Sequence, residues 1–484
     1  MKRSLQVMKF GGTSVGDAAC IQRVAKIVAD ASKEGPVVAV VSAMGGVTNR
    51  LIQAAQSCQA DHQELADSIF AALRQQHENA LNQLIRDPER RGRIAARMVK
   101  LFAEGERLCQ GTALLRELTA RTLDTISSLG ERLCAPMVAG ALEEVGIKSE
   151  AVEATELIVT DLFHGGADPL MAETRDKCDA RLRSLMANGV VPVVTGFIGA
   201  TRDGELTTLG RGGSDYSATI LGAALDASEV IIWTDVDGVL TADPRLVPEA
   251  RIIPEISYRE ATELAYFGAK VLHPKTLRAV GQAGIPVWIR NSFAPERTGT
   301  KITPSGRSNG GGVKALTAIR DVVLIAVGGP GIVGVPDVVG RTFSTTAEVH
   351  ASVLLISQSS SQNDICFIVA SADAQRTVDA LRREFAQDVA HEKVEHITMN
   401  PHIAIVAVVG ENMRGAPGIA GRTFGALGRD NINIIAIAQG SSESNISFVV
   451  EEKDMQAALV CTHREFALGG PASREFATQG TRNA

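Results

Sequence analysis

The sequence is short of aromatic residues, of cysteine and of charge of one sign. Phenylalanine, tryptophan and tyrosine together make up 4% of its 484 residues. The seven cysteines form no Cys-X-X-Cys pair and are odd in number, which argues against a disulfide framework or a zinc site and favours a reducing compartment. The net charge of −6 argues against wholesale binding to nucleic acid or to an anionic membrane.

Long apolar runs are also missing, since none approaches the ~20 residues that cross a bilayer. Only eight residues precede the first motif, which begins at Lys9, so we expect no leader peptide and a cytoplasmic location. The chain has instead 46 glycines and 45% apolar residues, enough for a large core. Glycine-rich phosphate-binding loops on an α/β scaffold are therefore the leading interpretation.

Apolar, β-branched runs are typical of buried parallel strands, and each is followed here by a glycine-bearing loop and a helical pattern. This order predicts βαβ units and a parallel sheet covered on both faces. The runs are 5–10, 36–43, 189–197, 229–236 and 285–290. Residues 61–145 carry long helical patterns with few strand signals, so we expect a helical insertion or face layer there.

The C-terminal part of the chain repeats itself after a polar, glycine-rich linker at 304–313. Shifting 327–369 by 81 residues onto 408–450 gives 15 identities in 43 positions. Each copy has the order strand, loop, helix, strand, turn, strand, which suits a ferredoxin-like unit. Because 81 residues are long for one such unit, the two copies are expected to interleave. The end of the chain, 469–484, is expected to be disordered.

Two glycine corners follow the first two strands. KFGGTSVGD carries Lys9, Gly11 and Gly12, and VVSAMGGVTN carries Thr48. Paired glycines let backbone N–H groups approach an anion, and a lysine adds a compact cation. Both corners could also be ordinary βα turns. Because ligands bind at the carboxyl ends of parallel strands, the two corners are expected to face one ligand.

The most informative stretch is TTLGRGGSDYSA, 207–218. Arg211 lies between glycines and offers a planar fork for a carboxylate, which helix capping alone does not explain. A further strand end, WTDVDGVLTADPR, carries Thr234, Asp235 and Arg245 and suits a nucleotide or Mg²⁺ site, although a solvated turn would have the same residues. The stretch FGAKVLHP places Lys270 before Pro274.

Two further patterns are rejected as sites. The glycines of 329–334 follow a strand, as in a dinucleotide fingerprint, but no acidic residue closes the next strand. His391 and His396 have i, i+5 spacing, so we interpret them as part of a polar helix face and expect no metal site there.

Taken together, these motifs resemble the aspartokinases of the amino acid kinase superfamily. KFGGTSV, SLGER, TTLGRGGSDYSA, WTDVDGVLTADPR and YFGAKVLHP occur in the family's order, and the chain looks most like the kinase half of bifunctional aspartokinase–homoserine dehydrogenase. The resemblance implies a three-layer α/β/α kinase domain with a mostly parallel sheet at 1–303, followed by tandem ferredoxin-like ACT domains at 314–395 and 396–468.

The resemblance also implies the activity. Such an enzyme transfers the γ-phosphoryl group of ATP, with Mg²⁺, to the β-carboxylate of L-aspartate, as the first step of lysine, threonine and methionine biosynthesis. Lys9 and Asp215 would be catalytic. Nucleotide contacts would come from Lys9, Gly11, Gly12, Thr234, Asp235, Leu240, Arg245, Lys270 and Val271. The substrate would be bound by Thr48, Glu131, Arg211, Gly212, Gly213 and Ser214, with Arg211 on its α-carboxylate and Glu131 on its ammonium.

Regulation is implied by the paired C-terminal repeats. Their matched loops, with Ile356, Gln358, Ile437 and Gln439, resemble the effector contacts of threonine-sensitive relatives. Leu354 stands where lysine-sensitive relatives place an acid, so threonine is the expected inhibitor. ACT pairs usually associate, which implies a homodimer or larger homo-oligomer. A kinase for glutamate or N-acetylglutamate, and a regulatory protein with an inactive kinase core, remain alternatives.

Overall fold

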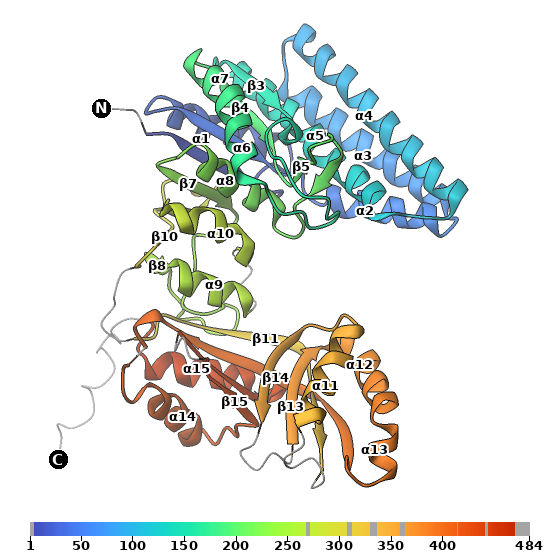
Figure 1. Ribbon diagram of the computed structural model, residues 1–484. Coiled ribbons are helices and arrows are strands. Elements are labelled where there is room, and N and C mark those ends of the chain that lie inside the picture. The colour runs from blue at the N-terminus through green and yellow to red at the C-terminus, as the bar shows by residue number, and fades with distance from the viewer. Residues whose placement is uncertain are drawn as a thin grey trace, which may run out of the picture. The chain divides into compact units, whose positions relative to one another are not determined.

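The computed structural model describes residues 4–267, 272–306, 312–329, 336–358, 364–413, 415–440 and 444–469 (Figure 1). Within these ranges the chain forms two compact units. The first holds the described residues of 4–239, 254–262 and 272–306, and the second holds those of 240–253, 263–267 and 312–469. The expected disordered tail therefore falls outside the described residues from position 470 on. No helix in the described ranges is both long enough and apolar enough to cross a membrane.

The first unit is built on an eight-stranded sheet with the order β3-β4-β2-β1-β7-β9-β10-β8. All neighbouring strands are parallel except β9 and β10, so the predicted mostly parallel sheet is confirmed. The strands are β1 (Gln6–Phe10), β2 (Val37–Val41), β3 (Ser149–Val152), β4 (Val191–Thr195), β7 (Glu229–Thr234), β8 (Glu255–Ser257), β9 (Val287–Asn291) and β10 (Thr300–Thr303). A separate hairpin pairs β5 (Ile198–Ala200) with β6 (Leu206–Thr208).

All five strands expected from the β-branched runs are present, and most of their residues are buried. Every residue of β2 and β4 is buried. Helices cover the sheet: α1 (Ala18–Ser32), α5 (Ala120–Glu144), α6 (Met171–Cys178), α7 (Ser184–Ala187), α8 (Gly213–Ala224) and α10 (Pro274–Ala283). Helix α9 (Tyr258–Tyr266) follows β8, and its last residues belong to the second unit.

The helical region expected at 61–145 is also confirmed. It consists of α3 (Gln63–Leu84), α4 (Pro88–Leu115) and α5, which pack against one another and against α2 (Val47–Gln59), the helix just before this region (Figure 1). Helix α4 begins where Asp87 accepts a hydrogen bond from the backbone of Arg90, with a proline in its first turn. Helix α5 also contacts β3 and β4, so this region forms part of a face layer as well as an insertion.

The second unit is built on a six-stranded sheet with the order β12-β13-β11-β14-β16-β15. Its strands are β11 (Ala315–Gly328), β12 (Val353–Gln358), β13 (Asp364–Ala370), β14 (His396–Val409), β15 (Ala436–Ala438) and β16 (Asn445–Glu451). Its helices are α11 (Pro336–Glu348), α12 (Ser371–Glu384), α13 (Ala386–Ala390), α14 (Ile419–Arg429) and α15 (Met455–Glu465). The two repeats therefore have the same element order, as the sequence predicted.

The two repeats interleave through their long first strands. The start of β11, 315–319, pairs with the end of β14, and the end of β11, 322–328, pairs with the start of β14. Leu316 accordingly packs with Val406 and Phe448 in one core, whereas Ile325 and Ile397 belong to the other. Residues 240–253 also join the core around Phe448, because Ala242 and Val247 are buried there.

One expectation about this unit was wrong. His391 and His396 do not share a helix face, because α13 ends at Ala390 and His396 begins β14. Glu392 between them adopts a positive φ of 56°, which turns the chain from the helix into the strand. The described residues contain no cluster of three or more potential metal ligands.

Candidate active site

The corner after β1 brings a buried lysine against an aspartate from a distant part of the chain. Lys9 is 8% exposed, and its Nζ lies 2.6 Å from Oδ1 of Asp215 on α8. A Cβ atom on Gly11 would lie 3.2 Å from this Nζ, so a side chain there would crowd the ammonium group. The sequence places Lys9 and Asp215 in one site, and their ion pair confirms that they are neighbours.

The second glycine corner packs directly on the first. A Cβ on Gly12 would lie 3.2 Å from the carbonyl oxygen of Ala43, and one on Gly45 would lie 3.6 Å from the carbonyl oxygen of Gly12. Gly46 adopts a φ of +76° at the start of α2, which leads to Thr48 in the first turn. The two corners therefore lie side by side, as expected for loops at the carboxyl ends of adjacent parallel strands.

Helix α5 contributes a buried carboxylate to the same region. Glu131 is 2% exposed, and its Oε1 is 3.5 Å from the hydroxyl of Ser214. Burial raises its pKa to about 8, against the opposing effects of a backbone N–H near Ala43, the Ser214 hydroxyl and the charge of Lys9. Its Oε2 has no hydrogen-bond partner among the described residues. A positively charged group would relieve this carboxylate.

The loop before α8 has an unusual backbone that exposes one arginine. Gly210 and Gly212 have φ values of +78° and +72°, and a Cβ on Gly212 would meet the side chain of His273 at 2.7 Å. Gly213 is equally confined, since its Cβ would touch Phe197. Arg211 is exposed and forms no ion pair with the part of the chain that the structure describes. Its guanidinium group is therefore available to an anionic ligand.

This loop is braced by a carboxylate that the sequence interpretation missed. Asp124 on α5 is 3% exposed. Its oxygens accept hydrogen bonds from the Thr208 hydroxyl (2.5 Å), the Thr208 N–H (3.2 Å) and the Gly165 N–H (3.0 Å), and one lies 2.9 Å from Nδ1 of His164. The carbonyl oxygen of Gly165 in turn abuts Gly210, where a Cβ would lie 3.0 Å away.

A helical spacing signal could have pointed to Asp124. It lies seven residues before Glu131 on one helix, so both project from the same face. A second missed residue is His273, which belongs to the quoted stretch FGAKVLHP. Burial lowers its pKa, and the charges of Lys275 and Arg211 lower it further, whereas Asp215 opposes the shift.

The residues expected to bind the nucleotide fall into three groups. Thr234 ends β7 and donates to Asp235 over 3.2 Å, and the loop of Gly11 bonds to the same strand through the Trp233 carbonyl oxygen. Leu240 and Arg245 belong to the second compact unit, where Arg245 forms an ion pair of 2.6 Å with Asp243. Lys270 and Val271 lie outside the described residues. Their roles remain predictions.

The expected effector residues lie in the second unit. Ile356 and Gln358 are exposed on β12, and Ile437 and Gln439 are exposed in and after β15. The two strands approach each other, because the Ser357 hydroxyl donates to the Ile437 carbonyl oxygen over 3.4 Å. A cavity of about 310 Å³ lies there, lined by Phe267, Val353, Leu354, Leu355, Ile356, Ala438, Gly440, Asn445 and Ser447.

Comparison with known proteins identifies the family. Residues 4–291 match the model of the amino acid kinase family, and residues 325–385 and 406–466 match an ACT domain model. The chain is 32% identical over 473 residues to Aspartokinase 1, chloroplastic, of Arabidopsis thaliana, covering 96% of this chain and 81% of that protein. It is 36% identical over 466 residues to the bifunctional aspartokinase/homoserine dehydrogenase of Haemophilus influenzae, covering 95% of this chain and 56% of that protein.

Among solved structures, that of E. coli aspartokinase III in complex with aspartate and ADP matches with a TM-score of 0.79 and 30% identity, covering 95% of this chain and 99% of that one. The structure of the same enzyme in complex with lysine and aspartate also matches with a TM-score of 0.79, at 29% identity, covering 96% of this chain and 99% of that one. The chain spans about half the length of the bifunctional relatives that it matches. The chain belongs to the amino acid kinase family and, within it, to the aspartokinases that carry ACT domains.

Proposed function

We propose that this chain transfers the γ-phosphoryl group of ATP to the β-carboxylate of L-aspartate, giving 4-phospho-L-aspartate and ADP. The observation that carries the proposal is the convergence of Lys9, Asp215 and Glu131 beside two glycine corners. Exposed Arg211, four residues before Asp215, supplies a fork for a carboxylate. Aspartate has the matching groups, an ammonium for Glu131 and an α-carboxylate for Arg211.

The chemistry needs no general base, because the attacking β-carboxylate is already ionised at neutral pH. The protein has to align it with the γ-phosphorus and offset the negative charge that develops there. Lys9 can do this as a cation, and the backbone N–H groups of the glycine corners add to it. Gly11, Gly12, Thr234, Asp235, Leu240, Arg245, Lys270 and Val271 would hold the nucleotide, and Thr48, Gly212, Gly213 and Ser214 would complete the aspartate site.

Mg²⁺ is part of this proposal. Magnesium sites in kinases typically use one or two carboxylates together with the phosphates of the nucleotide. The donor set fits, since Asp235 is exposed at the end of β7 and Asp215 lies beside Lys9. The ion would offset charge on the phosphates. The proposal further includes a role at the first step of lysine, threonine and methionine biosynthesis, and a cytoplasmic location, which the free cysteines of the described chain favour.

A coupled assay for ADP release tests the proposal directly. We expect release that depends on L-aspartate, with glutamate and N-acetylglutamate giving little. Glu131 and Arg211 suit a free α-amino acid, so the acetylated substrate would leave the buried carboxylate unpaired. Release that is unaffected by aspartate, or equal with glutamate, would contradict the proposal.

Threonine is the proposed inhibitor. None of the described residues that line the cavity between β12 and β15 is acidic, and Leu354 is among them. A lysine ammonium buried there would lack a carboxylate, whereas a threonine side chain has no charge to bury. We expect threonine at millimolar concentration to inhibit and lysine to have little effect. Inhibition by lysine alone would refute this assignment of Ile356, Gln358, Ile437 and Gln439.

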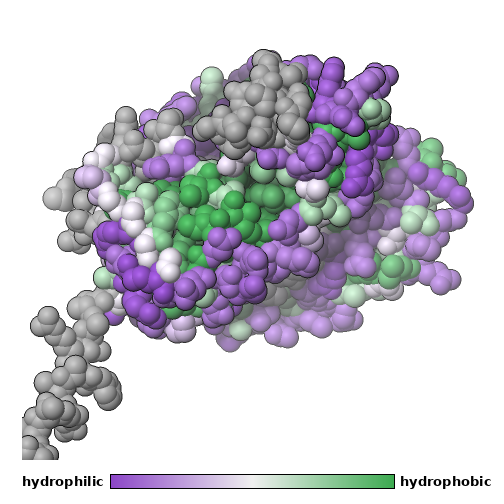
Figure 2. All heavy atoms as spheres, turned by 90° about the horizontal axis from the view of Figure 1, so that it is seen from below, coloured by the Kyte–Doolittle hydropathy of each residue, from purple (hydrophilic) through white to green (hydrophobic). Residues whose placement is uncertain are grey.

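Association through the ACT domains is also proposed. Large apolar side chains remain exposed in the second unit, among them Ile356, Met399 and Ile437. Figure 2 shows apolar side chains gathered into a patch framed by hydrophilic residues on one face of the molecule. Such patches commonly mark interaction surfaces, which supports a homodimer or larger homo-oligomer.

Asp124 is expected to position the aspartate site without touching the substrate. Asn in its place keeps the size of the side chain but loses the charge and replaces one oxygen with an NH₂ donor. Its single oxygen cannot serve the Thr208 and Gly165 N–H groups and His164 at one side while the Thr208 hydroxyl also keeps its acceptor at the other. We expect Asp124→Asn to raise the KM for aspartate at least about tenfold, corresponding to one or two lost charge-assisted bonds, while the KM for ATP changes less than about twofold.

Matched variants test whether the effect is specific to this network. Thr208→Val removes one bond to Asp124 and should raise the KM for aspartate less than Asp124→Asn does. Thr208→Ser keeps the hydroxyl and should leave this KM near that of the unmodified chain. Glu229→Gln is the control, because Glu229 also accepts two side-chain hydrogen bonds, from Gln6 and Trp288, at the far end of β7. If the KM for aspartate and the KM for ATP change equally in all variants, Asp124 has no positioning role at the aspartate site.

A further inference from the structure

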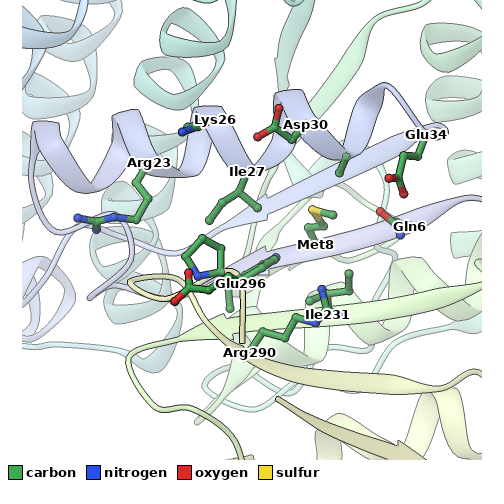
Figure 3. A pocket seen from close by; sticks show the side chains of 13 residues that line it. Gln6, Met8, Arg23, Lys26, Ile27, Asp30, Glu34, Ile231, Arg290 and Glu296 are labelled. Atoms are coloured by element: carbon green, nitrogen blue, oxygen red, sulfur yellow. The ribbon is translucent and has the colours of Figure 1, made fainter. Parts of the chain in front are cut away.

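A cavity of about 460 Å³ lies between helix α1 and the sheet. Figure 3 shows side chains of α1, including Arg23, Lys26 and Ile27, along one side of it, and Met8, Ile231 and Arg290 from the strands opposite. Its volume lies within the range of small-molecule binding sites. No residue proposed above for ATP or aspartate lines it.

The cavity lies on the other face of the sheet from the ion pair of Lys9. Successive side chains of a strand point to opposite faces, so Met8 faces α1 while Lys9 faces Asp215 on α8. The tryptophan of this face, Trp233, is paired in register with Phe10 and stacks on it. The cavity is therefore separate from the proposed active site.

Two buried N–H donors in the cavity lining lack acceptors. Trp233 is 3% exposed, and its indole Nε1 has no hydrogen-bond partner among the described residues. The Nε of Arg290 is also buried and equally without a partner there. By contrast, the other tryptophan, Trp288, donates from Nε1 to Glu229 over 2.8 Å. Unpaired buried donors are rare and costly, so the polar groups of these two side chains are under-satisfied on this face of the sheet, and the partly exposed Arg290 also lines the cavity.

Three cations of the lining are available to an anionic acceptor. Arg23, Lys26 and Arg290 form no ion pair with any described residue. The guanidinium of Arg290 instead lies 4.9 Å from the ring of Trp288, and that of Arg23 lies 4.5 Å from Phe293. Three acids also line the cavity: Asp30, whose charge is met by Lys33 at 2.7 Å, and Glu34 and Glu296.

Apart from Gln6, the remaining lining is apolar. Met8, Ile27, Ile231 and the ring of Trp233 provide a surface that would exclude water from the body of a ligand. A bare anion such as inorganic phosphate would leave this surface uncovered. A ligand that uses the whole cavity therefore carries one oxyanion group and a small apolar body.

We propose that this cavity is a second binding site, for a small organic oxyanion such as a carboxylate or a phosphate monoester with an apolar body. Its oxygens accept from the guanidinium group of Arg290, with Lys26 adding charge, and its body packs on Met8, Ile27, Ile231 and the ring of Trp233. The site does not depend on the proposed kinase activity. Trp233 directly precedes Thr234, so an occupant would lie against the strand that carries the expected nucleotide contacts.

Intrinsic fluorescence reports on this site, because the sequence has two tryptophans and both rings lie within 6 Å of the guanidinium of Arg290. The probes are benzoate, phenyl phosphate, inorganic phosphate and benzamide, titrated into the full chain, with calorimetry as the second readout. We expect saturable binding of benzoate or phenyl phosphate, and the tighter of the two identifies the oxyanion. Neutral benzamide should bind at least about tenfold more weakly, because it lacks a charge-assisted bond.

Variants locate the binding. Arg290→Gln should weaken it about tenfold or more, and Lys26→Gln, on the exposed face of α1, provides a milder change if the first variant folds poorly. Arg202→Gln is the control, because Arg202 pairs with Glu173 at the surface and is not part of the lining. No saturable response to either anion, or an unchanged response in both Arg290→Gln and Lys26→Gln, overturns the proposal. Equal affinity for inorganic phosphate and phenyl phosphate overturns the role of the apolar surface.

Discussion

Lys9→Ala is expected to lower turnover by about 10²–10³-fold while the chain still folds. The lysine is the buried cation between the glycine corner and Asp215. Its loss would remove the proposed contact to the transferring phosphoryl group. By analogy with oxyanion donors, this contact is worth about 3–4 kcal/mol in the transition state. The measurement is kcat for aspartate-dependent ADP release, together with the thermal unfolding midpoint.

The control separates charge loss from damage to the fold. Lys100→Ala, on the exposed face of α4, should leave kcat within about twofold of the unmodified value, as is usual for a surface substitution. Lys9→Ala leaves Asp215 without its cation, which destabilises the fold in its own right. The double variant Lys9→Met with Asp215→Asn removes both charges. If Lys9→Ala is folded and has near-normal turnover, Lys9 is not catalytic.

The second large effect is expected at Glu131, through pH. Its pKa of about 8 means that the carboxyl is protonated below this pH and cannot attract an ammonium. As pH rises from about 6.5 to 8.5, the ionised fraction grows about 25-fold. We therefore expect the KM for aspartate to fall by a comparable factor over this range and to level off above about pH 9. The KM for ATP should not follow this trend.

Glu131→Gln should weaken aspartate binding and abolish its pH dependence. The same variant should not be less stable than the unmodified chain. The unfolded chain releases the Glu131 proton near its ordinary pKa of 4.5, whereas the folded chain keeps it until about 8. Stability is therefore lost progressively between these two pH values, and the glutamine variant escapes this loss. The thermal unfolding midpoint of Glu131→Gln, compared with that of the unmodified chain, should therefore rise with pH in this window. The same fall of KM in both proteins would show that another group titrates.

Much of the fold follows from local patterns. The β-branched runs predicted β1, β2, β4, β7 and β9 because residues buried on both faces of a parallel sheet leave a continuous apolar signal. The glycine corners could be placed at strand ends for the same reason. The repeat predicted two similar C-terminal units, and its long period predicted that they interleave.

The chemistry of the site depends on long-range contacts that no local pattern contains. The sequence supplied Lys9 and Asp215, but their ion pair spans more than 200 residues. The tertiary structure alone decided that Glu131 is buried and holds its proton to about pH 8, and that Asp124 binds Thr208 and Gly165.

By itself, the sequence determined the strands, the glycine corners, the duplicated C-terminal unit and the candidate residues. Hydrophobic periodicity and glycine act over a few residues, and one chain displays both directly. Only the tertiary structure decided which polar groups share a buried environment and which buried donors, such as Nε1 of Trp233, lack an acceptor. Desolvation and hydrogen bonding depend on what surrounds a group in space, and those neighbours come from distant parts of the chain.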